Sequence, residues 1–477
     1  MVSLKQFDIL CLYKTQGKLL PSWKKWLNEN ERYKIIFLDD KVIKTKTKNS
    51  SSLFFSSEKD LKEKLLKIAW ENVFLKIGFF ALEENQDFSY VKNIATEMFF
   101  AVEALFSDYS DFGLTAFKNT IHNLLNKKNK NWEFFQDKTS QGFKNIPAII
   151  CGAGPSLNLL APFLRKINNK ALIFAGGTAL PCTRALKIKV NFGAAIDKHE
   201  HAWIFAKKHI LNIPFFYESR LSPNIVASIK HPYLIRSYET LLEKWLLDEL
   251  KIKKIPFDGG WNVSTFLIHL AYNMGCNPII LAGIDLCYGD KKYAKGAQEE
   301  KKQHVVVFDG KKTQKDWVLA KKWIENFAFT HDNVIFFNLS KGFTFSGIKN
   351  INEKILGKKI LKKGFKRLEE IIEKNSQPLH IERKKIKNLL QDMERSLHFC
   401  QKVCRKMIGG DMTKIEEKIS SQIAYKFFLQ PIWDFFQYPI MREVKEKTLL
   451  AYQVNQALFY LKIIEECLQV IKDAKKT

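Results

Sequence analysis

Short apolar runs alternate with helical patterns over the middle of the chain, and this alternation is the main guide to its fold. The runs have the length of strands; they are Pro147–Cys151, Leu172–Ala175, Phe192–Ile196, Pro214–Tyr217, Pro278–Ile284 and Val334–Phe337. Strands that alternate with helices are typical of a parallel sheet covered on both faces. Residues 146–350 are therefore predicted to form a Rossmann-like α/β domain, whose ligands bind at the carboxyl ends of the strands.

A smaller α/β pattern precedes this domain. Apolar runs at 7–13 and 34–38 flank a polar, Trp-bearing stretch at 21–30 that we interpret as a helix. A loop rich in Lys, Thr, Asn and Ser follows at 44–52, and helical patterns occupy 59–70, 91–107 and 111–127. These patterns predict an N-terminal α/β domain over 1–128, and the polar stretch 128–145 is interpreted as a linker.

The strand pattern stops near residue 353. The rest reads as amphipathic helices at 353–375, 378–406, 411–428 and 441–474, with breaks near Gly409-Gly410 and Pro431. We predict a helical C-terminal domain over 353–477 that serves as a structural or assembly surface. A chain of 477 residues accommodates this division, because domains average about 150 residues.

The charge of the chain is strongly positive, with 77 Lys and Arg against 50 Asp and Glu and a formal net charge of +27 at pH 7. Such an excess favours acidic partners. However, the basic residues are mostly Lys, are spread from end to end and form no run of five or six. We interpret them as a solvated surface and do not expect nucleic acid as the specific partner.

Cysteine usage and the termini indicate the compartment. The eight Cys show no C-x-x-C spacing, so a reduced compartment fits best. Cys400 and Cys404 lie near His398 but lack a second ligand pair, and we interpret them as small apolar residues on a helix. The N-terminus lacks the apolar core of a signal peptide, and no apolar run is long enough to span a bilayer. We expect a soluble, cytoplasmic protein.

The strongest local motif follows the first strand of the central domain. Its residues are Gly152, Ala153, Gly154, Pro155 and Ser156. The glycines permit a close backbone approach, and the helix that follows would present N–H groups and its dipole to a phosphate. The motif has neither the third Gly of G-x-G-x-x-G nor the Lys of a P-loop. A purely structural β–α turn is the alternative interpretation.

A second Gly-rich turn opens a helix at about 263–274. Gly260 precedes Asn262, a natural N-cap, and Ser264 and Thr265 lie in the first turn. This arrangement predicts a second backbone site for an anion.

Carboxylates end two of the predicted strands. Asp285 ends the strand at 278–284, and a carboxylate there often faces a substrate. The loop 286–315 behind it, with Tyr288, Lys292 and Tyr293, is long enough for a lid or a binding loop.

Asp197 ends the strand at 192–196. The sequence Asp197-Lys198-His199-Glu200 matches a helix capping box, and with His201 it also suggests a metal site. We favour the capping interpretation for the cluster and a ligand-binding role for the Asp197 carboxylate. Asn338 follows the last strand and is expected to close the crevice.

These segments together resemble the 6-hydroxymethylpterin diphosphokinase MptE-like domain, the central part of the motility accessory factor (Maf) glycosyltransferases. The resemblance covers about 146–350 and rests on the order of its pieces: Gly152–Leu157, Thr178–Leu180, the strand ending at Asp197, Gly260–Thr265, Gly275–Leu286, and Asn338–Gly342 with Gly347. The Gly-x-Gly-Pro-Ser turn is also similar to that of bacterial sialyltransferases.

The resemblance implies a fold and an activity. Maf-type proteins carry a domain before the core and a helical domain after it, as predicted here. It implies transfer of a nonulosonic (sialic-like) acid from a CMP-sugar to a protein hydroxyl, with flagellin as the acceptor in motile relatives. The two Gly-rich turns would hold the nucleotide phosphate, Asp197 and Asp285 would contact ribose, sugar or Mg²⁺, and Thr178, Tyr288, Lys292 and Asn338 would contact substrate.

One position departs from the family pattern. Tyr293 stands where we expect a His before Ala294. A phenol is a poor general base at neutral pH, so Tyr293 is assigned to hydrogen bonding of the leaving phosphate. The general base stays open, with His231 and His304 as candidates.

Two other functions remain open. An ATP-dependent diphosphokinase acting on a pterin-like alcohol would need Mg²⁺ held by carboxylates such as Asp197 and Asp285. A non-catalytic binding or assembly module would use the helical tail and the basic surface instead.

Overall fold

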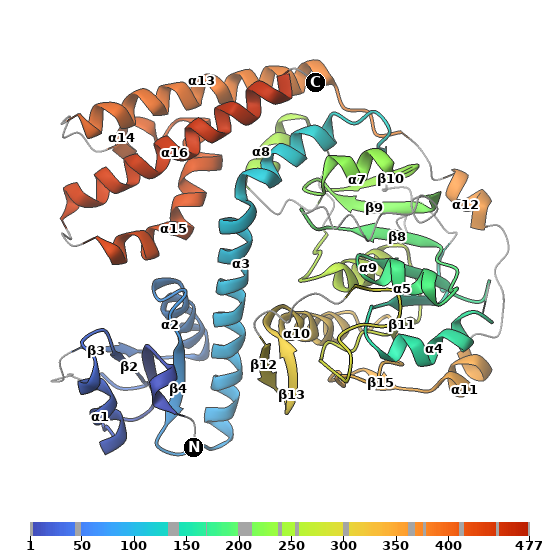
Figure 1. The fold of residues 1–477 in the computed structure, drawn as a ribbon, viewed down its shortest axis with the longest axis horizontal. Helices are drawn as coiled ribbons and strands as arrows, with labels where there is room; N and C mark the ends of the chain where they lie inside the picture. Colours follow the sequence, from blue (N-terminus) through green and yellow to red (C-terminus); the bar gives the residue numbers. More distant parts are fainter. Residues whose placement is uncertain are drawn as a thin grey trace. The chain divides into compact units, whose positions relative to one another are not determined.

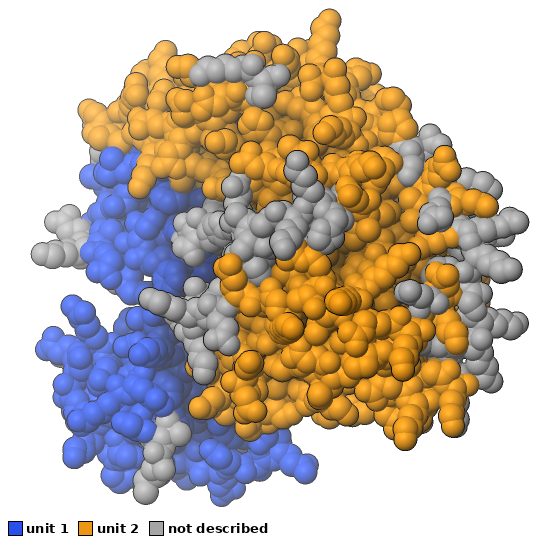
Figure 2. All heavy atoms as spheres, turned by 45° about the vertical axis from the view of Figure 1, so that its right-hand side comes forward, with its two compact units in different colours: residues 1–111, 432–459 blue, residues 112–431, 460–477 orange. Residues whose placement is uncertain are grey.

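The chain folds into two compact units, each built around a parallel sheet (Figures 1 and 2). The computed structural model describes residues 3–42, 49–131, 143–167, 169–198, 212–236, 241–252, 257–298, 305–360, 368–374, 378–409, 415–444 and 448–475. Unit 1 consists of Met1–Asp111 and Ile432–Phe459, and unit 2 of Phe112–Pro431 and Tyr460–Thr477. The division into two units does not test the predicted division into three domains, which stays a prediction.

Unit 1 contains a four-stranded parallel sheet of order β3-β2-β1-β4. Its strands are β1 (Ile9–Tyr13), β2 (Lys34–Asp39), β3 (Ser50–Phe54) and β4 (Ile77–Ala81). Alternate residues of β1 enter different cores. Leu10 and Leu12 pack with Trp23 and Trp26 of α1 (Pro21–Glu29), whereas Ile9, Cys11 and Tyr13 pack with Leu61 and Leu65 of α2 (Glu58–Glu71).

Two sequence expectations in this region were wrong. The loop expected at 44–52 ends in β3, whose polar residues pair with β2 along its edge. The helices expected at 91–107 and 111–127 form one helix, α3 (Gln86–Leu124). The polar stretch 108–110 between the two predicted helices is therefore helical and does not end the helix.

Unit 2 contains a nine-stranded sheet of order β15-β14-β11-β6-β7-β8-β9-β10-β5, in which every pairing is parallel. This confirms the Rossmann-like fold class. The strands are β5 (Lys130–Asn131), β6 (Ala148–Cys151), β7 (Leu172–Gly176), β8 (Phe192–Ala195), β9 (Pro214–Glu218), β10 (His231–Ile235), β11 (Ile279–Ala282), β14 (Phe336–Asn338) and β15 (Lys349–Asn350). Strand β10, which opens with His-Pro, lies in a stretch where we expected no strand.

Helices cover both faces of this sheet (Figure 1). On one face α9 (Val263–Asn273) and α10 (Lys315–Thr330) pack on a core that includes Ile150 and Phe174. The alternate residues Ile149 and Ile173 are also buried and point to the opposite face, where α4 (Ser156–Leu164) contacts β11 and α5 (Ala179–Ala185) contacts β7. Burial on both faces explains why the strands read as continuous apolar runs.

The sheet reverses its strand order between β6 and β11. Strands β6 to β10 follow one another in one direction, and β11 and β14 lie on the other side of β6. The carboxyl ends of β6 and β11 therefore form the topological switch point, where open α/β sheets bind ligands.

The loop expected at 286–315 contains a hairpin, which the sequence reading missed. Strands β12 (Val305–Phe308) and β13 (Lys311–Gln314) pair antiparallel. Asp309 and Gly310, both with positive φ, form the two-residue turn between them, as hairpin turns of this length require.

The remaining described elements are mainly helical. They are η1 (Leu4–Gln6), α7 (Pro223–Ser228), α8 (Leu241–Glu249), α11 (Glu353–Ile355), the π-helical turn η4 (Leu356–Ile360), α12 (Leu368–Lys374), α13 (Arg383–Ile408), α14 (Ile415–Ile419), the π-helical turn η5 (Tyr425–Leu429), α15 (Gln430–Glu443) and α16 (Leu449–Lys475). Cys400 and Cys404 lie on the buried face of α13, and each thiol is free. No helix in the described ranges is both long and apolar enough to cross a bilayer.

Candidate functional site

Asp285 lies at the switch point of the nine-stranded sheet and is 5% exposed. Oδ2 accepts the Ser156 N–H at 2.8 Å, and Oδ1 accepts the Ser156 hydroxyl at 2.5 Å. Oδ1 also accepts the N–H groups of Lys341 and Gly342 at 3.1 and 3.2 Å. The Asp285 carboxylate therefore connects the segments that follow β6, β11 and β14. We call Asp285, Ser156, Lys341 and Gly342 the Asp285 brace.

Glycines of the first motif, together with Gly342 after β14, allow the segments of the Asp285 brace to approach one another closely. A Cβ on Gly154 would lie 2.4 Å from Asp285 Oδ2, and a Cβ on Gly342 would lie 2.0 Å from the Asp285 carbonyl oxygen. A Cβ on Gly152 would lie 2.4 Å from the carbonyl oxygen of Gly283. The sequence predicted that these glycines allow the backbone to approach a ligand closely. In the structure, the close approach is to a neighbouring segment of the same sheet.

The predicted phosphate site at 152–156 has its β–α turn in place, but much of its hydrogen-bonding capacity is used. The Gly152 and Gly154 N–H groups donate to the carbonyls of Ala282 and Gly283, each at 2.8 Å. The Asp285 carboxylate occupies the N-terminus of α4, where an anion was expected. A phosphate would have to compete with that carboxylate, so the phosphate-binding role of this turn stays a prediction.

The second Gly-rich turn is a capping box, as expected for Asn262. Its Oδ1 accepts the N–H groups of Ser264 and Thr265 at 2.9 and 3.1 Å, and Thr265 Oγ1 accepts the Asn262 N–H at 3.0 Å. Gly260 has φ +64°, and a Cβ there would lie 2.5 Å from Thr265 Oγ1. The side chains of Asn262 and Thr265 therefore hold the turn itself, and a phosphate role for this turn stays a prediction.

Asn338 is also internal to the fold. It is 1% exposed, accepts the Ser340 N–H at 2.9 Å and donates to Asn350 Oδ1 at 2.9 Å. It shapes the turn that carries Lys341 and Gly342 to Asp285. The structure thus places Asn338 next to the Asp285 brace, where it positions backbone.

A second group of predicted residues lies partly open to solvent after β11. The Lys292 ammonium is 4.9 Å from the centroid of the Tyr293 ring and 6.0 Å from that of Trp317. The Tyr288 ring lies 5.2 Å from Trp317. We call Tyr288, Lys292, Tyr293, Asp316 and Trp317 the Lys292 cluster. It presents one cation beside aromatic rings. This arrangement suits a ligand that carries both an anionic group and a ring.

Asp316 belongs to this cluster and was missed in the sequence. Desolvation by the surrounding protein raises its pKa, the neighbouring Asp197 raises it further, and Lys292 and backbone N–H groups lower it. The residue itself is exposed to solvent. An exposed carboxylate whose pKa is raised beside other charged groups is a candidate functional residue. Its position in the first turn of a helix behind a long loop gave no sequence signal.

Asp197 and Thr178 reach the same edge of the sheet from neighbouring strands. Asp197 is exposed just beyond β8, and its charge acts on Asp316. Thr178 is half-buried at the N-cap of α5, and its side chain makes no cap bond. The adjoining Gly176 and Gly177 pack against Val263 at the start of α9. The structure therefore brings the ends of β7 and β8 to the second Gly-rich turn.

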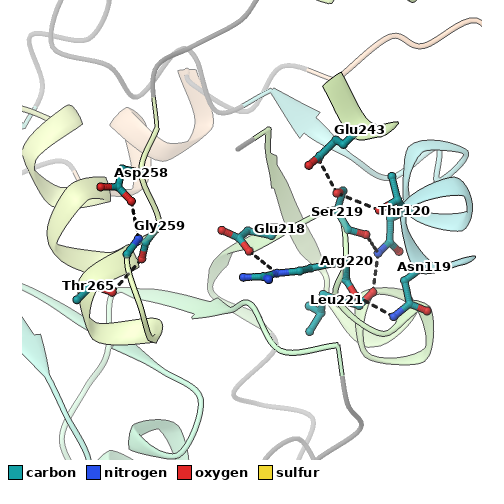
Figure 3. A network of polar contacts seen from close by, with 12 residues as sticks. Asn119, Thr120, Glu218, Ser219, Arg220, Leu221, Glu243, Asp258, Gly259 and Thr265 are labelled. Carbon is teal, nitrogen blue, oxygen red and sulfur yellow. Dashed lines mark hydrogen bonds and ion pairs between the residues drawn. The ribbon is translucent and has the colours of Figure 1, made fainter. Parts of the chain in front are cut away.

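A further polar group at the end of β9 was also missed (Figure 3). Arg220 Nε donates to Glu218 Oε2 at 2.8 Å, and the Ser219 hydroxyl donates to Glu243 Oε1 at 2.6 Å. Asn119 and Thr120 of α3 bond to this segment at Arg220 O and Ser219 Oγ. The rule that ligands bind after strands would have indicated Glu218 and Arg220, which follow directly on the run 214–217.

Of the two candidate bases named from the sequence, only His231 lies among the described residues, and it lies away from this site. His231 begins β10, so it lies at the amino end of the strand, 3.4 Å from the Lys130 ammonium. Burial and the charges of Lys130 and Lys230 lower its pKa. His304 and the cluster His199, Glu200 and His201 lie outside the described residues.

Comparisons with known proteins agree with this architecture. A family model described as "6-hydroxymethylpterin diphosphokinase MptE-like" matches residues 118–291. The structure of the Maf glycosyltransferase from Magnetospirillum magneticum AMB-1 matches this chain with a TM-score of 0.54 and 13% sequence identity, over 98% of this chain and 78% of that chain. No curated protein matches the sequence. The chain therefore contains an MptE-like domain and has the fold of a Maf-type protein.

Proposed function

We propose that this chain is a glycosyltransferase that moves a nonulosonic acid from a CMP-activated donor to a hydroxyl of an acceptor protein. The observation that carries the proposal is the fold match to a Maf glycosyltransferase over 98% of the chain. That match includes the elements before and after the MptE-like domain as well as the domain itself.

The Lys292 cluster is the proposed donor site. A CMP-nonulosonate carries a phosphodiester and a carboxylate, so it needs cations together with flat apolar surface. Lys292 supplies the cation, and the rings of Trp317 and Tyr288 supply surfaces on which a base or sugar can stack. Tyr293 would donate a hydrogen bond from its hydroxyl to the leaving phosphate. Thr178 follows β7, which is separated from β11 by β6.

Asp316 is the proposed general base. In the transfer, the acceptor oxygen forms a bond to the anomeric carbon, the bond from that carbon to the CMP phosphate oxygen breaks, and CMP leaves. The acceptor proton must pass to a base, and a carboxylate works best when its pKa is raised towards the operating pH. Asp316 has such a raised pKa. Desolvation would keep this pKa high, with a smaller contribution from the charge of Asp197. The partial positive charge that develops on the sugar would be stabilised by both carboxylates.

Asp285 is proposed here as a positioning residue. Its oxygens accept four hydrogen bonds within the protein, so it fixes the start of the loop that carries Lys292. This differs from the catalytic role expected from the sequence, in which Asp285 would contact the substrate.

The second candidate is an ATP-dependent diphosphokinase, favoured by the description of the matching family model. That reaction would use Mg²⁺ bound by carboxylates. Asp197 and Asp285 were the expected pair, but the four internal hydrogen bonds of Asp285 do not fit a metal ligand. Within the described ranges no three metal-binding side chains cluster. We therefore derive no step through Mg²⁺.

Isothermal titration calorimetry with CMP, and with ATP in the presence of Mg²⁺, tests the proposal. We expect CMP to bind the wild type and Lys292→Gln to weaken that binding at least tenfold, because a hydrogen bond between charged groups contributes about 1.5–3 kcal/mol. Lys291→Gln removes an exposed neighbouring charge and should leave the affinity unchanged. Intact-mass spectrometry of an acceptor protein incubated with a CMP-nonulosonate then tests transfer.

The outcomes separate the functions. Binding of ATP with Mg²⁺ and no binding of CMP would favour the diphosphokinase. Absence of binding to either nucleotide would overturn both enzymes and leave the non-catalytic module. Equal loss of CMP affinity in Lys291→Gln and Lys292→Gln would show that general surface charge, and not the Lys292 cluster, binds the nucleotide.

A further inference from the structure

A cavity of about 320 Å³ lies beside α5, away from the candidate donor site. Its lining comes from α5, from the segment before β8 and from the residue before β9: Leu180, Thr183, Arg184, Lys187, Ile188, Lys189, Val190 and Ile213. Residues that precede β8 and β9 lie at the amino ends of these strands. The cavity therefore opens at the edge of the sheet opposite to Asp197 and Asp285, which follow strands.

The lining combines an apolar floor with uncompensated positive charge. Leu180 and Ile188 are almost fully buried, at 2% and 5% exposed, and Val190 and Ile213 are half-buried. The Thr183 hydroxyl is already bonded to the Leu180 carbonyl at 2.9 Å. The remaining polar groups of the lining are Arg184, Lys187 and Lys189.

None of the lining residues is acidic. Across the described part of the chain, no carboxylate forms an ion pair with Arg184, Lys187 or Lys189. Arg184 is half-buried, and Lys187 and Lys189 are exposed. An anion bound beside Arg184 would relieve the repulsion among these cations.

We propose that this cavity binds a small amphipathic anion, a soluble carboxylate or phosphate carried on an apolar body. The anionic group would pair with Arg184 and Lys187, since guanidinium and ammonium groups are the donors that such anions prefer. The apolar body would lie against Leu180 and Ile188 and would cover the half-buried Val190 and Ile213, removing their apolar surface from water. The volume is within the range of small-molecule sites.

Helix α5 separates this site from the donor site. Leu180, Thr183 and Arg184 lie on one face of the helix and line the cavity together with Lys187, which follows the helix. Pro181, Cys182 and Ala185 lie on the other face and contact the loop after Lys292: the Cys182 thiol donates to the Ala294 carbonyl at 3.6 Å, and Gly296 packs against Pro181 and Ala185. A substitution on the cavity face therefore leaves the contacts of the Lys292 loop in place.

Calorimetric titration of the full chain with sodium octanoate, inorganic phosphate and octylamine tests the proposal. We expect octanoate to bind, phosphate to bind at least tenfold more weakly and octylamine not to bind. The double variant Arg184→Gln/Lys187→Gln should weaken octanoate binding at least tenfold. Val190→Phe should also weaken it by filling the cavity, which keeps the test valid for a variant with unchanged charge.

Controls separate this proposal from the proposed function and from misfolding. Lys170→Gln removes an exposed charge before β7 that does not line the cavity, so octanoate binding should persist. All variants should keep the wild-type melting temperature and CMP affinity. Equal affinity for octanoate and phosphate, binding of octylamine, or retention of octanoate affinity in Val190→Phe would each overturn the proposal.

Discussion

Two groups of polar residues follow strands of the nine-stranded sheet, and they differ in how much of their bonding capacity the fold has used. In the Asp285 brace, the carboxylate is 5% exposed and accepts four hydrogen bonds from segments of the same sheet. In the Lys292 cluster, a cation lies over aromatic rings, and a solvent-accessible carboxylate has a raised pKa. The Asp285 carboxylate is hydrogen-bonded within the protein, whereas the charged groups of the Lys292 cluster are accessible to a ligand.

The difference teaches how to divide residues that look alike in the sequence. Asp285 and Asp197 both follow predicted strands, and both were expected to contact substrate. Burial with every oxygen bonded indicates a role in stability, because losing such a carboxylate leaves several buried donors unpaired. Partial exposure with unbalanced charge indicates a role in binding. Substitutions in the two groups should therefore separate stability from activity.

The largest expected effect comes from Asp285→Ala. The change leaves the Ser156 N–H and hydroxyl and the N–H groups of Lys341 and Gly342 without their acceptor. Each buried donor left without an acceptor costs about 1–3 kcal/mol, so the melting temperature measured by circular dichroism should fall by several degrees.

The control for this change is Asp290→Ala, which removes an exposed carboxylate in the same loop. It should alter stability by less than about 0.5 kcal/mol. If Asp285→Ala melted like wild type and instead lost only transferase activity, Asp285 would be a catalytic residue, and the distinction between the two groups would fail.

An intermediate effect is expected from Asp316→Asn, which should lower the transfer rate about 100-fold or more, as loss of a general base does. Stability should change in the opposite direction. Because the folded-state pKa of Asp316 is raised, ionisation is less favourable in the folded chain, and its contribution at neutral pH is destabilising. Asp316→Asn should therefore melt higher than wild type at pH 7.

The pH dependence of the stability also follows from the raised pKa of Asp316. As the pH falls through the raised folded-state pKa, wild type takes up a proton and regains stability, and the gain ends below the unfolded value of 3.8. The advantage of Asp316→Asn should shrink over this interval. Melting temperatures from pH 4 to pH 8 and pH–rate profiles check both parts; a variant that melts below wild type at pH 7 would contradict the assignment.

Much of the fold was predictable because buried parallel strands are continuous apolar runs. The strands β6, β8 and β11 lie within predicted runs, and β7, β9 and β14 extend one residue beyond theirs. Strand β3 was missed because its run of Ser residues depends on pairing with β2 and not on its own apolar pattern. The hairpin of β12 and β13 was missed although Asp309-Gly310 follows the apolar run Val305–Phe308, a pattern that indicates a hairpin turn.

The site was predictable in position but less so in role. The Gly-rich turns, Asp285 and Asn338 stand where the sequence placed them, yet their partners belong to distant segments that no local pattern can identify. Gly154 and Asp285, 131 positions apart in the sequence, exclude a Cβ between them. Asp316 and Trp317 were missed for the same reason: their importance comes from Lys292 and Asp197, which only the folded chain brings near.

The smallest effect is expected from Asn262→Ala, and it tests the comparison at a residue to which the sequence assigned phosphate binding. The Asn262 side chain accepts two N–H groups at the start of α9, and loss of an N-cap costs about 1 kcal/mol. Asn262→Ser restores a capping oxygen and should recover most of the stability. If the side chain only caps the helix, CMP affinity should be the same in wild type and both variants. A loss of CMP affinity in Asn262→Ala that Asn262→Ser does not recover would return Asn262 to the nucleotide site, because the capping oxygen would then be present and the amide alone missing.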